Sequence, residues 1–217
     1  MENWIANFIE FMPILLKGTI YTVEITLASI VLSTVLGFIW ALVLLSRHGL
    51  LRKAMRVIIN VVRGTPLLVQ MFYVYFVLPD IGIRLTALQA GIIGLSICYS
   101  AYHAEIFRAG IISISSGQWE AARAIGFKNY QIMARIVLPQ AARVILPPLG
   151  TSFIILLKDS SLASVITVRE LTRSGQLLAS TTFENMQVFT LVALIYISLT
   201  QVLAYLIQHL EKRYRIP

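Results

Sequence analysis

Residues 25–46, from Ile25 to Ser46, contain no charged side chain. A helix needs about 20 apolar residues to cross roughly 30 Å of hydrocarbon, so this stretch predicts a membrane span. The rest of the chain agrees, because 58% of its 217 residues are hydrophobic, 13% are charged and the mean hydropathy is +0.80. That balance differs strongly from the balance of a soluble domain. The sequence therefore predicts an all-α, polytopic membrane protein that forms a single transmembrane domain over residues 1–217.

The same length criterion predicts four more spans, which makes five transmembrane helices. They cover residues 57–79, 85–102 with an extension towards Ile112, 136–157 and 185–208. The fourth span contains Pro139, Pro147 and Pro148, which we expect to kink or interrupt the helix. Such prolines also occur in helices that have no role in transport, so they favour a pathway without proving one.

The basic residues predict the orientation of the spans. They concentrate after the first span, between the third and fourth, and after the fifth: Arg47, Arg52, Lys53, Arg56; Arg108, Arg123, Lys128, Arg135; Lys212, Arg213 and Arg215. Short loops rich in Lys and Arg stay in the cytoplasm, so we expect the N-terminus outside and the C-terminus cytoplasmic. This sorting also explains the net charge of +8, and we expect no nucleic-acid partner.

Residues 1–16 predict an interfacial helix ahead of the first span. Trp4, Ile5, Phe8, Ile9 and Met12 share one face, while polar side chains share the other. This segment has no basic region followed by a small-residue cleavage site, so a removable signal peptide is not expected.

Residues 115–130 form a polar connection on the predicted cytoplasmic side. Ser115 and Gln118 fit a capping box, the run QWEAARAI favours a helix, and Gly126 is a natural exit from it. A second short helix is predicted to start near Asn129 and continue into the fourth span. With Ala121 and Ala122 exposed, another protein can approach the backbone closely, and Glu120 offers a charge-assisted contact. The alternative is an amphipathic helix on lipid headgroups, anchored by Trp119.

The spacing in this connection resembles a known signature. Residues 120–139, which contain Glu120, Ala121, Ala122, Gly126, Ile136, Leu138 and Pro139, resemble the EAA-x3-G-x9-I-x-L-P signature of the membrane subunits of ABC importers. The stretches RGTPLLVQ (63–70), AYHAEIFRAG (101–110) and KDSSLASVI (158–166) resemble permeases of the polar amino acid (histidine, glutamate, glutamine, arginine, opine) uptake family. The resemblance extends over most of residues 17–210. Departures are Ser160 where members often have Thr, Ile125 for Leu and Ser115 for Pro.

The resemblance implies a type I ABC importer permease fold in a bacterial plasma (inner) membrane. Residues 115–130 would be the coupling helices, which seat in a groove of a cytoplasmic ATPase, with Glu120, Ala121, Ala122, Gly126 and Lys128 at the contact. The implied partners are two ATPase subunits, a second permease subunit, identical or homologous, and an extracytoplasmic binding protein that delivers an amino acid.

The sequence itself offers no catalytic chemistry. It contains no G-x-x-x-x-G-K-[ST] loop to bind phosphates, and His48, His103 and His209 have no zinc-like spacing. Cys98 is the only cysteine, so a cysteine-based metal site is not expected. We therefore predict no enzyme activity, no metal and no cofactor on this chain, with ATP and Mg bound by the ATPase subunits.

Ionisable and hydroxyl groups in or near the spans are candidates for substrate contact, because charge within a membrane is expensive. The predicted pathway residues are Arg63, Thr65, Glu105, Lys158, Asp159, Ser160 and Ser161. The acceptors Glu105, Asp159 and Glu170 favour a basic amino acid. The alternative for Glu105 is an ion pair with Arg108 at i, i+3, and for Lys158 a contact with Asp159 or a headgroup.

Two other classes remain open at this point. A secondary transporter or channel driven by an ion gradient predicts repeat symmetry between halves, which the sequence does not show. A membrane scaffold without a transport pathway would give no reason for Glu105, because an ionisable side chain within a span costs free energy. Dependence of uptake on ATP and an ATPase separates all three classes.

Overall fold

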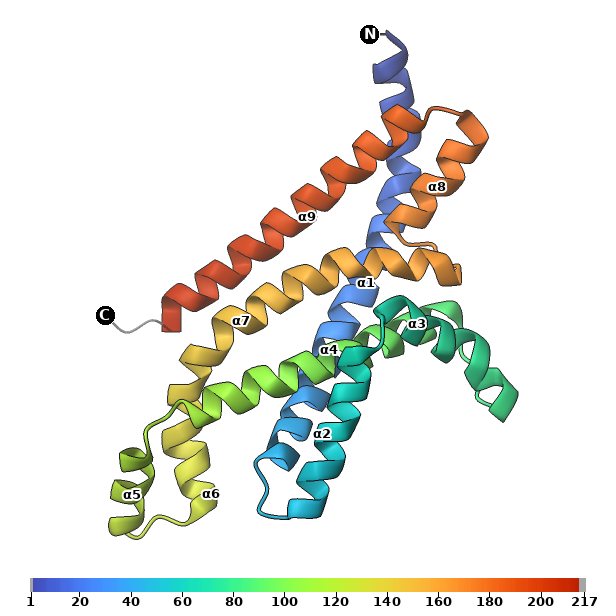
Figure 1. Ribbon diagram of the computed structural model, residues 1–217. Coiled ribbons are helices and arrows are strands. Elements are labelled where there is room, and N and C mark those ends of the chain that lie inside the picture. The colour runs from blue at the N-terminus through green and yellow to red at the C-terminus, as the bar shows by residue number, and fades with distance from the viewer. Residues whose placement is uncertain (1, 215–217) are drawn as a thin grey trace.

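A computed structural model describes residues 2–214, and every regular element within that range is a helix (Figure 1). The α-helices are α1 (Glu2–Leu44), α2 (Gly49–Gly64), α3 (Leu67–Phe72), α4 (Ala87–Ile112), α5 (Ser116–Ala124), α6 (Asn129–Ile132), α7 (Leu138–Asp159), α8 (Leu171–Thr182) and α9 (Asn185–Tyr214). Two π-helical turns, η1 (Tyr73–Val77) and η3 (Met133–Val137), and two 3₁₀ segments, η2 (Leu78–Ile81) and η4 (Ser160–Ile166), connect them.

Three helical stretches in the described chain are long and apolar enough to cross a membrane: Asn7–Leu44, Asn129–Ile166 and Asn185–Lys212. A bent pair, Gly49–Gly64 with Leu67–Ile81, makes a fourth if the two helices form one span. The predicted third span, now α4, has 26 residues and is long enough, but it is not among these stretches. Its polar side chains, such as Ser100 and His103, are buried inside the protein. The count of five spans therefore stays a prediction.

The prediction of one continuous helix over residues 57–79 is wrong, because α2 and α3 meet at an angle of 102°. Pro66 has no backbone N–H and disfavours a helical conformation at the residue before it, so Thr65 is extended. The Gln70 amide donates to the carbonyls of Val62 (2.8 Å) and Thr65 (2.9 Å), which satisfies acceptors that the break leaves open. The run Gly64-Thr65-Pro66 in the sequence already indicated a break in the helix at this point.

The interfacial helix predicted for residues 1–16 is not a separate element, because α1 runs unbroken from Glu2 to Leu44. Phe8 and Ile9, on the predicted apolar face, are exposed, whereas Phe11 and Leu15 are buried against α8 and α9. Asn7 also donates to the Gln187 amide oxygen of α9 at 2.8 Å. The side chains of residues 1–6, Trp4 and Ile5 among them, lie outside the described part.

The prolines of the predicted fourth span do not end α7. Pro139 directly follows the π-helical turn η3 inside the helical stretch Asn129–Ile166, and the helix continues through Pro147 and Pro148. α1 lies against α4, and close approach is possible because Gly37 has no side chain: a Cβ there would meet the His103 Cβ at 2.5 Å. In Figure 1 α5 and α6 lie at one end of the molecule, and α8 and the start of α9 lie at the other, beside the first half of α1.

Candidate functional site: a cavity with a few polar groups and an exposed elbow

A cavity of about 610 Å³ opens where α2 meets α3, between this break and helices α4 and α7. Its lining comes from all four helices: Arg63, Gly64, Thr65, Pro66, Leu67, Cys98, Tyr99, Tyr102, Ile106, Pro148, Thr151, Ser152, Ile155 and Asp159. Most of these residues are apolar or aromatic, and a few carry charge or hydroxyl groups. That composition is typical of a small-molecule site, in which a few polar groups fix the orientation of the ligand.

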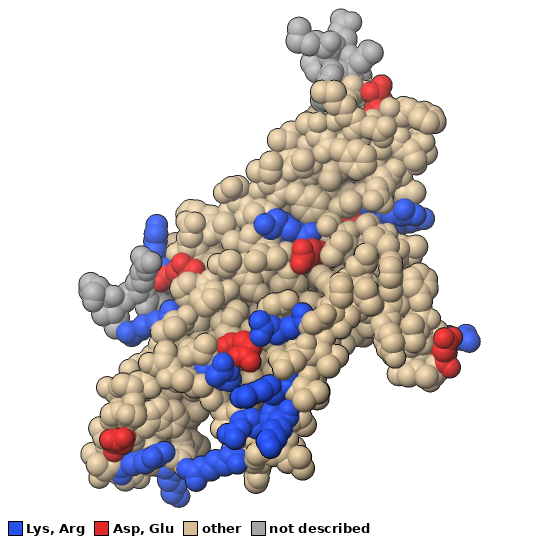
Figure 2. All heavy atoms as spheres, viewed as in Figure 1, with Lys and Arg blue, Asp and Glu red and all other residues tan. Residues whose placement is uncertain are grey.

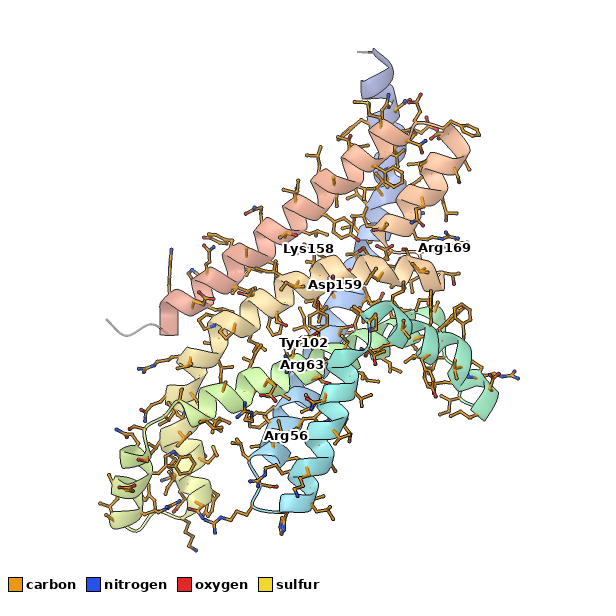
Figure 3. All side chains as sticks on the ribbon, viewed as in Figure 1. Arg56, Arg63, Tyr102, Lys158, Asp159 and Arg169 are labelled. Carbon is orange, nitrogen blue, oxygen red and sulfur yellow. The ribbon has the colours of Figure 1, made fainter. Side chains whose placement is uncertain are left out.

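One cation and one carboxylate line this cavity. Tyr99 of α4 donates its hydroxyl to Asp159 Oδ2 at 2.7 Å, which holds the carboxylate at the end of α7. The Arg63 guanidinium lies over the ring of Tyr102, with Cζ 5.3 Å from the ring centre. Such cation–π contacts hold an arginine in place without neutralising it. Figure 3 shows Arg63 and Tyr102 close together, with Asp159 on the neighbouring helix.

Hydroxyl groups complete the polar lining. Ser152 is within 2.9 Å of His103 Nε2, and His103 is itself fully buried between helices. Thr65 donates to the carbonyl of Val61 at 2.8 Å, and Thr151 donates to that of Pro147 at 3.1 Å. Each hydroxyl oxygen keeps acceptor capacity, so these groups can receive a hydrogen bond from a ligand.

The structure brings three predicted pathway residues, Arg63, Thr65 and Asp159, to the cavity, and it does not bring the other four there. The carboxylate of Glu105 instead forms an ion pair with Arg108 at 2.8 Å, as the alternative for Glu105 predicts. Lys158 is exposed, Ser161 is half-buried, and neither lines the cavity. Ser160 is fully buried and donates to the carbonyl of Leu157 at 2.7 Å.

Sequence reasoning missed Tyr99, Tyr102 and Thr151. Tyr99 and Tyr102 are one helical turn apart in α4, and each combines an aromatic ring with a polar tip. That spacing within a span was the available signal. No sequence pattern around Thr151 indicated that it would line the cavity.

Residues 115–130 form two short helices, as predicted, and we call this segment with its turn the elbow. Gly126 has φ +87° in the turn between α5 and α6, a conformation that favours glycine. The N–H of Phe127 donates to the carbonyl of Ala122 at 3.0 Å and closes the end of α5. The predicted capping box is wrong: Ser115 precedes α5, but its side chain makes no capping hydrogen bond.

The elbow presents a mixed surface, on which Ile125 and Tyr130 are exposed beside polar side chains. Glu120, Ala121 and Lys128 are exposed. The exposure expected of Ala122 is wrong, because its side chain is only 2% exposed and packs with Ile111 and Ile132. Ala122 thus packs α5 against the end of α4 and against α6.

The surroundings of the elbow are basic. Basic residues gather at the same end of the molecule over α2 and the elbow, as Figure 2 shows. Trp119 is half-buried and contacts the same apolar cluster as Ala122, which explains its position without a lipid anchor.

Comparisons with known proteins agree on the class of the chain. Residues 33–216 match the family described as "Binding-protein-dependent transport system inner membrane component". Over 206 residues, 95% of this chain and 91% of the relative, the sequence is 41% identical to YckA, a probable amino-acid ABC transporter permease protein of Bacillus subtilis (strain 168). GlnP, the glutamine transport system permease protein of Escherichia coli (strain K12), is 34% identical over 94% of both chains.

Solved structures give the same result. A chain in the crystal structure of an amino acid ABC transporter with histidines has a TM-score of 0.88 and 35% identity, with 96% of this chain and 97% of that chain covered. A chain of the MetNI methionine ABC transporter, at 21% identity and a TM-score of 0.82 over 95% of this chain and 99% of that one, shares the fold.

Apolar helices that surround a cavity with a few polar groups, and an exposed elbow at one end, fit a membrane transport subunit. The chain belongs to the family of binding-protein-dependent transport system inner membrane components. Within that family it is a permease component of an ABC amino acid importer, a transport component and not an enzyme.

Proposed function

We propose that this chain carries a zwitterionic amino acid through the cavity between the α2–α3 break, α4 and α7, driven by an ATPase that docks on the elbow. The observation that carries the proposal is the shared cavity lining of Arg63 and Asp159, one of each charge. A free amino acid has one carboxylate and one ammonium group, so these two side chains complement both ends of its backbone.

The lining supports a zwitterion more than a basic amino acid. Of the three acceptors that favoured a basic substrate, Glu105 is paired with Arg108 and Glu170 is buried against α8. Only Asp159 reaches the cavity, where Arg63 balances its charge. The apolar part of the lining is then left for the substrate side chain.

A second permease subunit would complete the pathway. Figure 2 shows charged residues spread over one face of the molecule, and Figure 3 places Lys158, Asp159, Arg63 and Arg56 on that face. Charged groups at membrane depth face protein or a water-filled cavity. This arrangement supports pairing of two subunits across the face, with five spans in each and the N-terminus outside.

The elbow supplies the coupling in this proposal. Glu120, Ala121, Gly126 and Lys128 form its exposed surface towards a cytoplasmic ATPase, and Ala122 supports that surface from beneath. Two ATPase subunits would bind ATP and Mg, and their closure would move the paired elbows and expose the cavities alternately to either side. An extracytoplasmic binding protein would deliver the amino acid to a bacterial inner membrane.

Uptake by vesicles that contain the reconstituted complex tests the substrate site. Asp159→Asn removes the negative charge but keeps the size of the side chain, and we expect KM to rise about tenfold, the cost of one charged hydrogen bond. Asp80→Asn is the matched control, because it makes the same change at an exposed carboxylate of η2 that does not line the cavity. Arg63→Gln should raise KM similarly.

Two results would contradict the proposal. Equal effects of Asp159→Asn and Asp80→Asn would mean that the cavity does not select the substrate. Uptake that persists without ATP in vesicles carrying an ion gradient would favour a secondary transporter instead.

A further inference from the structure

A second cavity, of about 510 Å³, lies between α1 and α8, away from the proposed pathway. Its lining combines two cations, Lys17 and Arg169, with the hydroxyl-bearing Tyr21, Ser174 and Thr181 and with Ile14, Gly18, Leu177 and Leu178. Gly18 lets the two helices approach here, since a Cβ at this position would meet Ser174 Oγ at 2.5 Å. The cavity therefore has a closely packed floor and an amphipathic wall.

The two cations come from segments far apart in the sequence, yet they line the same cavity. Neither has an ion-pair partner among the described side chains, in which Arg108–Glu105 is the salt bridge found. The acidic neighbour of Arg169, Glu170, is fully buried and accepts hydrogen bonds from the N–H groups of Thr172 and Arg173. None of the lining residues is acidic, so the cavity has an uncompensated charge that attracts an anion.

The rest of the lining identifies the kind of anion. Ile14 and Leu177 are exposed by 45% and 42% and flank the charged groups. Further along α1, Ile20, Leu27 and Val31 are also exposed, which is the pattern of a helix in contact with lipid. A ligand that matches cations, hydroxyls and an adjoining apolar surface has an anionic head and a hydrocarbon tail.

We propose that this cavity binds the phosphate headgroup of an anionic phospholipid, with Lys17 and Arg169 at the phosphate and Ile14 and Leu177 along the acyl chain. Tyr21, Ser174 and Thr181 offer hydroxyl groups to the headgroup oxygens. The lipid would fasten α8 to α1 next to Glu170. The proposal does not depend on which substrate crosses the other cavity.

Binding of short-chain dihexanoyl phosphatidylglycerol to the purified, delipidated complex tests this. The double variant Lys17→Gln, Arg169→Gln should bind it about thirtyfold more weakly than the wild type, from two phosphate contacts. Arg173→Gln is the control, because Arg173 lies on α8, close to Arg169 in the sequence, but does not line the cavity. Two further ligands are measured in the same way. Dihexanoyl phosphatidylcholine has the same acyl chains but no net charge, and inorganic phosphate has the charge but no acyl chains.

Each outcome of the binding experiment either supports the lipid site or overturns it. Strong binding of phosphatidylglycerol that is lost only in the double variant supports the proposal. Equal losses in Arg173→Gln and the double variant would overturn it, because general surface charge would then explain the binding. Equally tight binding of inorganic phosphate would mean a simple anion site. An unchanged lipid affinity with lost stimulation by the binding protein would mean that the cavity is a protein contact.

Discussion

The two ends of the molecule are built differently. At one end, which we call the outer junction, α1, α8 and α9 meet around Glu170, whose carboxylate accepts hydrogen bonds from Thr172 N (2.8 Å), Arg173 N (2.7 Å) and the Tyr196 hydroxyl (2.9 Å). Thr22 of α1 accepts from the N–H of Leu171 at 3.0 Å. At the other end, the elbow exposes its polar side chains and turns at a single glycine.

This difference has a physical meaning. Buried polar networks are costly unless every member is satisfied, and once satisfied they hold helices in one arrangement. The outer junction is therefore a rigid frame. The elbow leaves its polar groups to water, so a partner protein can bind them without breaking internal bonds. If the proposed ATPase moves the subunit at the elbow, a rigid outer junction keeps α1, α8 and α9 in place during that movement.

The largest expected effect is on the outer junction. Glu170→Ala removes the acceptor of three hydrogen bonds, and we expect the free energy of unfolding to fall by about 3 kcal/mol. Tyr196→Phe removes one of these bonds and should cost about 1 kcal/mol. Denaturation of the purified complex measures both, and equal, small effects would mean that the junction is not a frame.

The second largest effect is expected at Gly126, and it can be compared with Gly82, a glycine outside the elbow that has the same backbone conformation. Gly126 in the elbow has φ +87°, Gly82 beyond η2 has φ +88°, and neither has atoms within 4 Å of an added Cβ. Valine strains either turn by about 1–2 kcal/mol. Gly126→Val should lower ATP-driven uptake about tenfold, whereas Gly82→Val should leave it near the wild-type rate. A loss shared by both variants would point to general misfolding.

A smaller effect is expected at the exposed elbow carboxylate. Glu120→Gln should weaken ATPase binding to the permease roughly fivefold, since exposed charge pairs contribute about 1 kcal/mol or less. Gln118→Ala, two residues away on the same exposed helix, is the control. Binding of the purified ATPase measures the difference, and neither variant should change the stability of the permease.

The smallest effect is a pH dependence of the outer junction. Burial raises the pKa of Glu170 above its ordinary value of 4.5, although the N–H donors of Thr172 and Arg173 oppose the shift. The folded state therefore binds the proton more tightly than the unfolded state, and stability falls as pH rises from about 4.5 through the raised pKa. We expect this loss in the wild type, no such slope in Glu170→Gln, and the wild-type slope in Glu120→Gln.

The sequence predicted what depends on local pattern. Hydropathy located the helices, and the spacing from Glu120 to Pro139 located the elbow and its glycine turn. Tertiary packing decided the rest. Ala122 is buried because α5 packs against α6 and η3 and shares an apolar cluster with Ile111 at the end of α4. The cavity joins residues from α2 and α7 that are nearly a hundred positions apart, and no periodicity brings Arg63 and Asp159 together.

The central claim is that movement of the elbow opens and closes the cavity, and thiol labelling tests it most directly. Thr151→Cys in a Cys98→Ala background places one thiol on the exposed part of the cavity lining. We predict that an ATP analogue changes its labelling rate in the complex at least several-fold, and that Gly126→Val removes this response while Gly82→Val keeps it. A labelling rate indifferent to nucleotide, or a response that survives Gly126→Val unchanged, would contradict the account.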